Sequence, residues 1–95
     1  MPAYMVFIRD KTNDAQEMQI YGQKAGPASA GHPIKPLAIY GKHEVVEGPA
    51  IEGAVIVEFP DMEAAKAWYD SPGYTEAREH RFKGADYRAF IVEGI

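Results

Sequence analysis

The chain has 95 residues, of which 46% are hydrophobic and 25% are charged. This length and mixture are typical of one folded domain, so we expect residues 1–95 to form a single domain without a separate cofactor module. Ten Lys and Arg residues against 14 Asp and Glu residues give a net charge of −4, which disfavours nucleic acid as a partner. The absence of cysteine excludes disulfides, thiolate nucleophiles and cysteine-bound metal clusters.

No apolar run approaches the roughly 20 residues that cross a bilayer. The apolar beginning of the chain is interrupted by Arg9 and Asp10, and it has neither a basic leader nor a cleavage site. We therefore expect no membrane partner and, by default, a cytoplasmic location.

The first half of the chain predicts a strand and a helix. Residues 3–9 are apolar on both parities, as in a strand that is buried on two faces. Asn13 is a suitable helix cap, and Met18, Tyr21 and Ala25 follow at helical spacing. The Gly-Pro and Gly-His-Pro segments within residues 26–35 are expected to end or kink this helix, and its last residue stays open.

The middle of the chain predicts two further strands. Residues 36–40 form a short apolar run, which residues 44–47 are expected to continue after Gly41. Residues 52–59 alternate most clearly and are again apolar on both parities, apart from Glu58.

Two cap signals follow the third strand. Asp61 predicts the start of a helix with Met62, Ala65 and Tyr69 on one stripe. Ser71, with proline next to it, predicts a further helix that ends near residue 82. Residues 86–93 then predict the last strand.

This order of elements is compatible with a ferredoxin-like βαββαβ sandwich, an α+β fold with an antiparallel sheet. In that topology the helices cover one face of the sheet, and the first and third strands lie at its centre. Because both predicted central strands are apolar on either side, a second copy of the chain is the economical cover for the free face. We therefore expect a homodimer that packs through its sheet faces, held by several apolar side chains worth roughly 1.5–3 kcal/mol each.

Several segments of the sequence resemble domain-of-unknown-function family 1330, which belongs to the dimeric α+β barrel superfamily. The resemblance rests on Glu58-Phe59-Pro60, on Glu63-Ala64-Ala65, on the segment from Trp68 to Tyr74, on Arg81, on the middle hairpin from Tyr40 to Gly48 and on the ending Val92-Glu93-Gly94. It implies the same ferredoxin-like fold, with two protomers forming a dimeric α+β barrel. It implies little chemistry, because the wider superfamily ranges from cofactor-free monooxygenases to lactone isomerases, polyketide cyclases and haem enzymes.

An aromatic and basic cluster is the main candidate binding site. A guanidinium beside aromatic rings can bind a carboxylate or an enolate while the rings hold a planar carbon skeleton. The alternative is that the rings are core residues and that the arginines pair with Glu58, Glu63 or Glu76. The residues of this cluster are Trp68, Tyr69, Tyr74, Arg78 and Arg81.

Glu58 and Tyr40 are the candidate catalytic residues. A carboxylate in an apolar strand must be paired or have its pKa raised, and a raised pKa suits a general base. An ion pair of Glu58 with Arg81 or Arg9 is the alternative. Tyr40 could supply a phenol to the same cavity, although packing at an edge strand explains it equally well.

No metal site or cofactor is expected. His32, His43 and His80 have no nearby carboxylate at metal-ligand spacing, and Ser71 before proline is typical of a cap rather than of a nucleophile. The sequence leaves two functions open. One is the binding of a small planar anionic or carbonyl metabolite between sheet and helices, with cofactor-free proton-transfer or cyclisation chemistry. The other is a non-catalytic binding or stress-associated dimer without an active site.

Overall fold

Four strands and three helices make up the protein in a computed structural model that describes all of residues 1–95. In chain order they are β1 (Ala3–Thr12), α1 (Ala15–Ala28), β2 (Lys35–Ile39), β3 (Gly53–Phe59), α2 (Met62–Tyr69), α3 (Pro72–Gly84) and β4 (Ala85–Glu93). The strands form one sheet in the order β2-β3-β1-β4, and all neighbours are antiparallel. The predicted α+β, ferredoxin-like fold is therefore confirmed.

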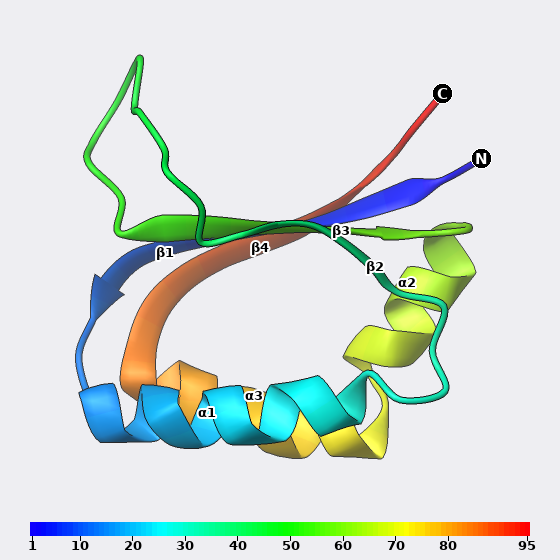
Figure 1. Ribbon diagram of the computed structural model, residues 1–95, viewed down its shortest axis with the longest axis horizontal. Helices are drawn as coiled ribbons and strands as arrows, with labels where there is room; N and C mark the ends of the chain where they lie inside the picture. Colours follow the sequence, from blue (N-terminus) through cyan, green and yellow to red (C-terminus); the bar gives the residue numbers. More distant parts are fainter.

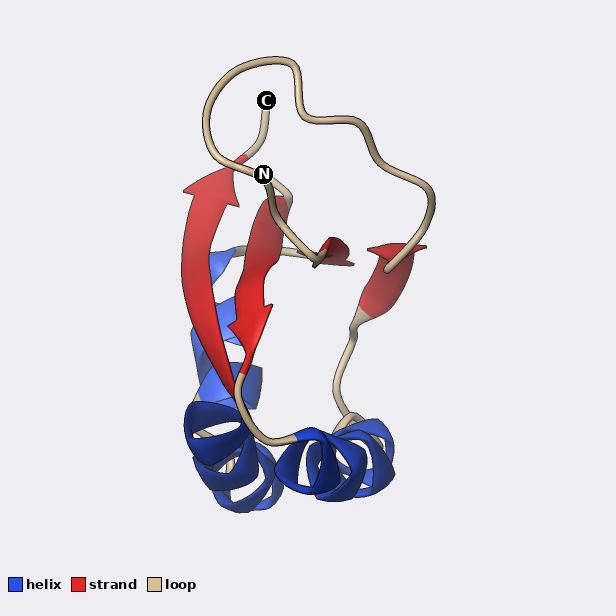
Figure 2. Ribbon diagram, turned by 90° about the vertical axis from the view of Figure 1, so that its left-hand side faces the viewer, coloured by secondary structure: helices blue, strands red, loops and turns tan.

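All three helices lie on one face of the sheet, which we call the inner face (Figures 1 and 2). The long loop between β2 and β3 and both ends of the chain rise on the other side, the outer face (Figure 1). None of the helices is both long and apolar enough to cross a membrane.

The hydrophobic core lies between the inner face and the helices. Alternate residues of the central strands point into it, because successive side chains of a strand point to opposite faces. The aromatic rings of Trp68 and Tyr74 are stacked in this core with their centroids 4.0 Å apart. The nine fully buried members of the core are Ala3, Met5, Phe7, Val57, Phe59, Ala65, Trp68, Tyr74 and Ala77.

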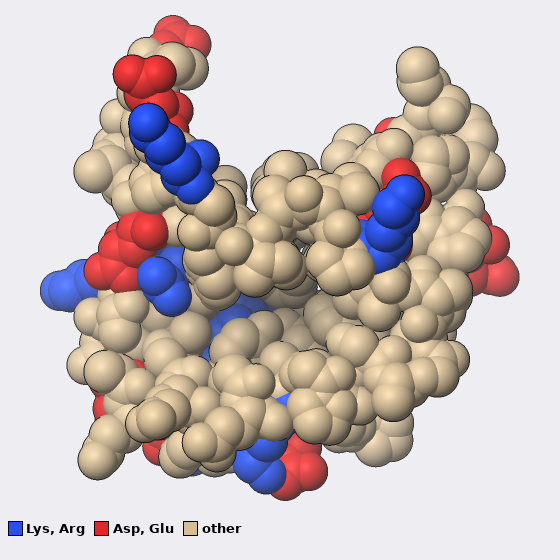
Figure 3. All heavy atoms as spheres, in the orientation of Figure 1, with Lys and Arg blue, Asp and Glu red and all other residues tan.

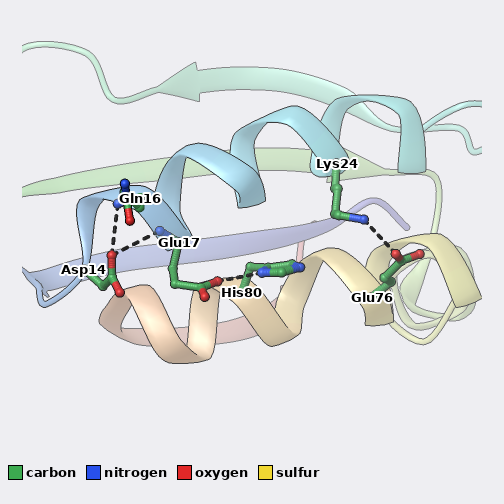
Figure 4. A network of polar contacts seen from close by, with 6 residues as sticks. All are labelled: Asp14, Gln16, Glu17, Lys24, Glu76 and His80. Atoms are coloured by element: carbon green, nitrogen blue, oxygen red, sulfur yellow. Dashed lines mark hydrogen bonds and ion pairs between the residues drawn. The ribbon is translucent and has the colours of Figure 1, made fainter.

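The structure corrects the predicted start of the first helix. Asp14, not Asn13, caps α1, and its carboxylate accepts hydrogen bonds from the backbone N–H groups of Gln16 and Glu17 (Figure 4). Asn13 instead donates from its side chain to Asp86, at the start of β4. An ionised carboxylate accepts these N–H groups more strongly than an amide does, and it favours the helix dipole.

The structure also defines the last residue of this helix, which the sequence left undecided. α1 continues through Pro27 and ends at Ala28, and the chain then turns through Gly31 at φ +80°. Pro27 has no N–H to donate to the carbonyl four residues earlier, which agrees with the end of the helix one residue later.

The predicted continuation of the second strand over residues 44–47 is wrong. β2 ends at Ile39, and Tyr40 adopts a left-handed backbone with φ 49° that turns the chain away from the sheet. Residues 44–47 then have no neighbouring strand to supply ladder hydrogen bonds, so they form part of an exposed loop.

The two predicted caps in the second half are confirmed. The Asp61 carboxylate accepts from the backbone N–H of Ala64, and the Ser71 hydroxyl accepts from the N–H of Tyr74. α3 is about half a turn longer than predicted and ends at Gly84, after which β4 begins at once.

Helices α1 and α3 lie side by side and are joined by polar contacts (Figure 4). Glu17 lies 2.6 Å from Nδ1 of His80, and Nζ of Lys24 lies 2.7 Å from Glu76. The imidazole of His80 is therefore paired with the carboxylate of Glu17 between the two helices.

The outer face of the sheet carries no helix, although its residues are mostly apolar. Phe90 and Val92 are 50% and 48% exposed. They pair with the half-buried Val6 and Tyr4 of the central strand β1. Ile56 of β3 pairs with Val6 from the other side, so the apolar residues are continuous across three strands.

Candidate ligand-binding site

A cavity of about 480 Å³ lies between α1 and the strands β2 and β3. Figure 3 shows the surface hollowed between the sheet and the helices, with basic atoms deep inside the hollow. Most lining residues are apolar or aromatic, which is the usual composition of a small-molecule site. They are Phe7, Tyr21, Gly22, Ala25, Gly26, Ser29, Ile34, Pro36, Ile39, Tyr40, Val55, Val57 and Trp68.

The cavity exists because α1 turns its small residues toward the sheet. Gly22 and Gly26 are four residues apart and lie on one helical face beside Ala25. No atom outside the helix lies within 4 Å of where a Cβ on either glycine would be. Glycine in a helix costs roughly 1 kcal/mol relative to alanine, so the helix loses stability where the empty space forms.

Arg81 is the only charged residue among those that are fully buried, with 2% of its surface exposed. No carboxylate lies within 4.0 Å of its guanidinium, and its Nε atom has no hydrogen-bond partner. Its guanidinium carbon lies 5.3 Å from the ring centroid of Phe7, which lines the cavity, and 4.9 Å from that of Tyr87. A buried cation without an anion is costly, so Arg81 is the strongest polar feature beside the cavity.

Two tyrosines that flank this cation are hydrogen-bonded to each other. The hydroxyl oxygens of Tyr21, which lines the cavity, and Tyr74, which is fully buried, lie 2.8 Å apart. Burial raises the pKa of both phenols, and the Arg81 guanidinium partly opposes this for each of them. Both phenols are therefore neutral at neutral pH and act as hydrogen-bond donors rather than as bases.

A second pair of phenols joins the two edges of the sheet. The hydroxyl of Tyr40, which lines the cavity, is hydrogen-bonded to the hydroxyl of Tyr87 on β4. Burial and, after it, the hydrogen bond with Tyr40 raise the pKa of Tyr87. Tyr87 is thus neutral at neutral pH.

Trp68 provides part of the cavity wall. Its ring packs against those of Phe7, Phe59 and Tyr74, and it is 4% exposed. Its indole N–H is buried without an acceptor. The indole N–H and Nε of Arg81 are thus two buried donor atoms that lack an acceptor within the chain.

The structure does not bring Glu58 to this cavity. Val55 and Val57 line the cavity, so Glu58 points to the outer face, where it pairs in register with Tyr4 and Lys35. The expectation of a base at Glu58 inside the cavity is thereby corrected. The alternative ion pair with Arg9 is absent too, because Arg9 Nε lies 3.2 Å from Glu52.

Tyr69 and Arg78 lie together outside the cavity. The Arg78 guanidinium carbon is 4.2 Å from the Tyr69 ring centroid, and Arg78 also donates to the Tyr69 backbone carbonyl. Tyr69 lines a separate, shallower hollow of about 400 Å³ between α2 and β4. Of the seven predicted site residues, Tyr40 and Trp68 line the cavity, and Tyr74 and Arg81 lie behind its wall.

Sequence reasoning missed the role of Tyr21 and Tyr87, and of the glycines Gly22 and Gly26. The glycines carry a readable signal, because two glycines four residues apart inside a predicted helix are unfavourable unless they make room for something. The tyrosines carry no such signal, because their meeting depends on long-range packing between different elements.

The residues that line the cavity offer hydrogen-bond donors but no negatively charged acceptor. The lining contains no Asp, Glu or His. The phenols of Tyr21 and Tyr40 and the indole of Trp68 belong to lining residues, and the guanidinium of Arg81 lies behind the cavity wall. Such a set complements a ligand rich in acceptor oxygens and with negative charge.

A family model matches residues 2–95, and its description is Domain of unknown function (DUF1330). The chain belongs to this family. The resemblance to DUF1330 inferred from the segments between Tyr40 and Gly94 is therefore confirmed over almost the whole chain. No curated protein matches the chain.

Solved structures share the fold of this DUF1330 domain. A protein of unknown function from Rhodopseudomonas palustris is 22% identical, with a TM-score of 0.78, over 99% of this chain and 82% of that one. A dimeric ferredoxin-like protein of unknown function from Bacteroides fragilis is 14% identical, with a TM-score of 0.65, over 98% and 96%. SnoaB, a cofactor-independent oxygenase from Streptomyces nogalater, is 10% identical, with a TM-score of 0.64, over 99% and 93%. At these identities the likeness establishes the fold alone.

Proposed function

We propose that the protein binds a small planar organic anion, such as an aromatic or keto carboxylate, in the cavity between α1 and the sheet. The observation that carries the proposal is the unpaired, buried Arg81 beside a cavity whose lining has no acidic residue. The ligand's negative charge compensates the guanidinium, and the rings of Trp68, Tyr21 and Tyr40 hold its planar skeleton.

The cavity is large enough for such a ligand. Its volume of about 480 Å³ falls within the range of roughly 300–1,000 Å³ for small-molecule sites. Its walls bury apolar carbon, while the donors fix the orientation of oxygen atoms. A carbonyl group next to the carboxylate would give the buried indole N–H of Trp68 an acceptor as well.

The test compares planar carboxylates with their uncharged amides. Benzoate, salicylate and phenylpyruvate should raise the melting temperature of the protein, and the matching amides should do so much less, because only the acids supply an anion to Arg81. In the Arg81→Met variant the preference for the acid should vanish, a loss of roughly tenfold in affinity, because the cation behind the cavity wall that attracts the negative charge is then gone.

Arg78→Met is the matched control, because Arg78 stacks on Tyr69 away from the cavity. It should bind the acids like the unchanged protein. Equal binding of acids and amides, or the same loss of binding in both variants, would contradict the proposal. So would an Arg81→Met variant that keeps its preference for the acids.

Cofactor-free chemistry is the second candidate, and one observation favours it: Tyr40 lines the cavity and carries a phenol, a group able to donate a proton to a carbonyl. SnoaB has chemistry of the cofactor-independent kind within the same fold. The cavity itself supplies no carboxylate or imidazole base, so binding without turnover is our first proposal. Mass spectrometry of each ligand after long incubation with the protein distinguishes the two.

We further propose that the protein is a homodimer that packs through its outer sheet faces. The apolar side chains of β1, β3 and β4 on this face would otherwise remain against water. Twofold packing of one surface against its own copy is the commonest symmetric solution. The neighbour from Bacteroides fragilis is described as dimeric, which agrees with the proposal.

A further inference from the structure

A row of residues crosses the inner face at one end of the sheet. Tyr87 of β4 pairs with Arg9 of β1, and Arg9 pairs with Gly53 of β3. Tyr40 directly follows β2, and its backbone N–H donates to the carbonyl of Ala54 at 2.9 Å. Tyr40 and Tyr87 therefore start from the two edges of the sheet, three strand spacings of about 4.8 Å apart.

The hydroxyls of Tyr40 and Tyr87 are nevertheless hydrogen-bonded, so both side chains lie flat across the sheet. Gly53 makes this possible, because a Cβ at that position would lie 2.7 Å from Cδ1 of Tyr40. The Arg9 guanidinium carbon lies 4.6 Å from the Tyr40 ring centroid and holds the ring from another side.

The backbone of Tyr40 is itself unusual. Its φ of 49° lies in the left-handed region, which bulky residues rarely adopt. Such a conformation persists only where the surroundings enforce it. Here the hydrogen bond to Tyr87, the stacking of Arg9 and the space over Gly53 enforce it together.

Tyr40 also stands between the cavity and solvent, because it lines the cavity and is 39% exposed. We infer that the Tyr40 ring controls access to the cavity, and that Gly53 is the positioning residue that lets the ring lie there. The importance of this access for a ligand rests on the proposed function, but the control of access can be measured without any ligand.

The experiment uses Trp68, the only tryptophan of the chain, which lines the same cavity. Acrylamide, a neutral quencher of fluorescence, measures how easily a small molecule reaches it. Gly53→Ala should displace the Tyr40 ring and raise the quenching constant. Gly41→Ala, in the loop that precedes β3, is the matched control, because no atom lies within 4 Å of where its Cβ would be, and it should leave the constant unchanged.

A double variant tests whether Gly53 acts through Tyr40. Tyr40→Ala should raise the quenching constant, and adding Gly53→Ala to it should raise it no further, because the ring that the new methyl group displaces is already gone. Full additivity of the two changes, or an unchanged constant in Gly53→Ala, would overturn the inference. Circular dichroism of each variant confirms that it is folded.

If Gly53→Ala does not fold, Tyr40→Ala and Tyr40→Phe replace it. A higher quenching constant in Tyr40→Ala supports the control of access, and a constant equal to that of the unchanged protein overturns it. Salicylate binding is then measured on the same variants. If no carboxylate binds while the quenching changes as expected, the proposed function fails and the inference about Tyr40 stands.

Discussion

The hydroxyl oxygens of Tyr21 and Tyr74 lie 2.8 Å apart and join α1 to α3 beside the buried Arg81. Each hydroxyl satisfies the other in a region that water does not reach easily. Removing one of them leaves the other without its partner, which costs more than the hydrogen bond itself contributes.

We therefore expect Tyr21→Phe and Tyr74→Phe each to lower the free energy of unfolding by roughly 1–2 kcal/mol. The double variant should lose less than the sum of the two, because no unpaired hydroxyl remains. Urea denaturation of the four proteins measures this coupling. Strict additivity would show that the two hydroxyls do not depend on each other.

The same pair predicts how stability depends on pH. Burial raises the pKa of Tyr21 and of Tyr74 above the ordinary value of 10.0. Above about pH 10 the unfolded chain releases these protons while the folded chain keeps them, so unfolding becomes more favourable as the pH rises. Below that pH both states are protonated, and the contribution is complete.

The melting temperature should consequently fall steeply above pH 10, and less steeply in the Tyr21→Phe variant. Phenolate absorbance in the same titration should show buried tyrosines that ionise only as the protein unfolds. Ionisation of every tyrosine near its ordinary pKa in the folded protein would contradict this reading of the site.

The glycines of α1 predict a way to fill the cavity. Gly22 lines the cavity and has open space where a side chain would project. Gly22→Leu should fill part of this space and abolish carboxylate binding, while the helix gains up to about 1 kcal/mol from losing a glycine. Gly22→Ala is the control, since it makes the same backbone change with one methyl group.

Calorimetric titration with salicylate, together with thermal melting, distinguishes these effects. Both variants should melt at or above the temperature of the unchanged protein, and only the leucine variant should lose binding. Undiminished binding by Gly22→Leu would place the ligand elsewhere.

The outer face predicts the effect of a single charge on assembly. Phe90 is 50% exposed on β4 and pairs with Val6 at the centre of the apolar face. Phe90→Glu would bury a carboxylate against apolar side chains in the proposed dimer, so we expect it to form monomers. Phe82→Glu is the control, because Phe82 is 61% exposed on α3, on the helical side of the molecule.

Light scattering during size-exclusion chromatography measures the mass of each variant. The unchanged protein and Phe82→Glu should have twice the mass of Phe90→Glu. A monomeric unchanged protein would contradict the proposed dimer, and it would leave the apolar residues of both central strands unexplained.

Much of the fold could be read locally. The alternation over residues 52–59 and the caps at Asp61 and Ser71 are short-range signals, and each element formed where they predict it. The prediction was wrong over residues 44–47, because a strand also needs a partner, and the turn at Tyr40 takes this segment away from the sheet.

The site was predicted only in part. Trp68 and Arg81 stood out by residue type, whereas Glu58 was assigned to the wrong face of the sheet. The alternation of side chains along a strand assigns its residues to the two faces of the sheet. When both faces are apolar, this alternation does not show which face the helices cover. Packing of the helices against Val55 and Val57 decides this, and it sends Glu58 to the outer face.

The order of residues along the chain thus determined the strands, the caps, the family and the apolar character of both sheet faces, because these depend on neighbours a few positions apart. Only the tertiary structure decided that Tyr21 meets Tyr74, that Tyr40 reaches Tyr87 across Gly53, and that Arg81 is left without a carboxylate. The two hydroxyl pairs join residues that are 53 and 47 positions apart in the sequence, and they exist only once the helices have packed onto the sheet.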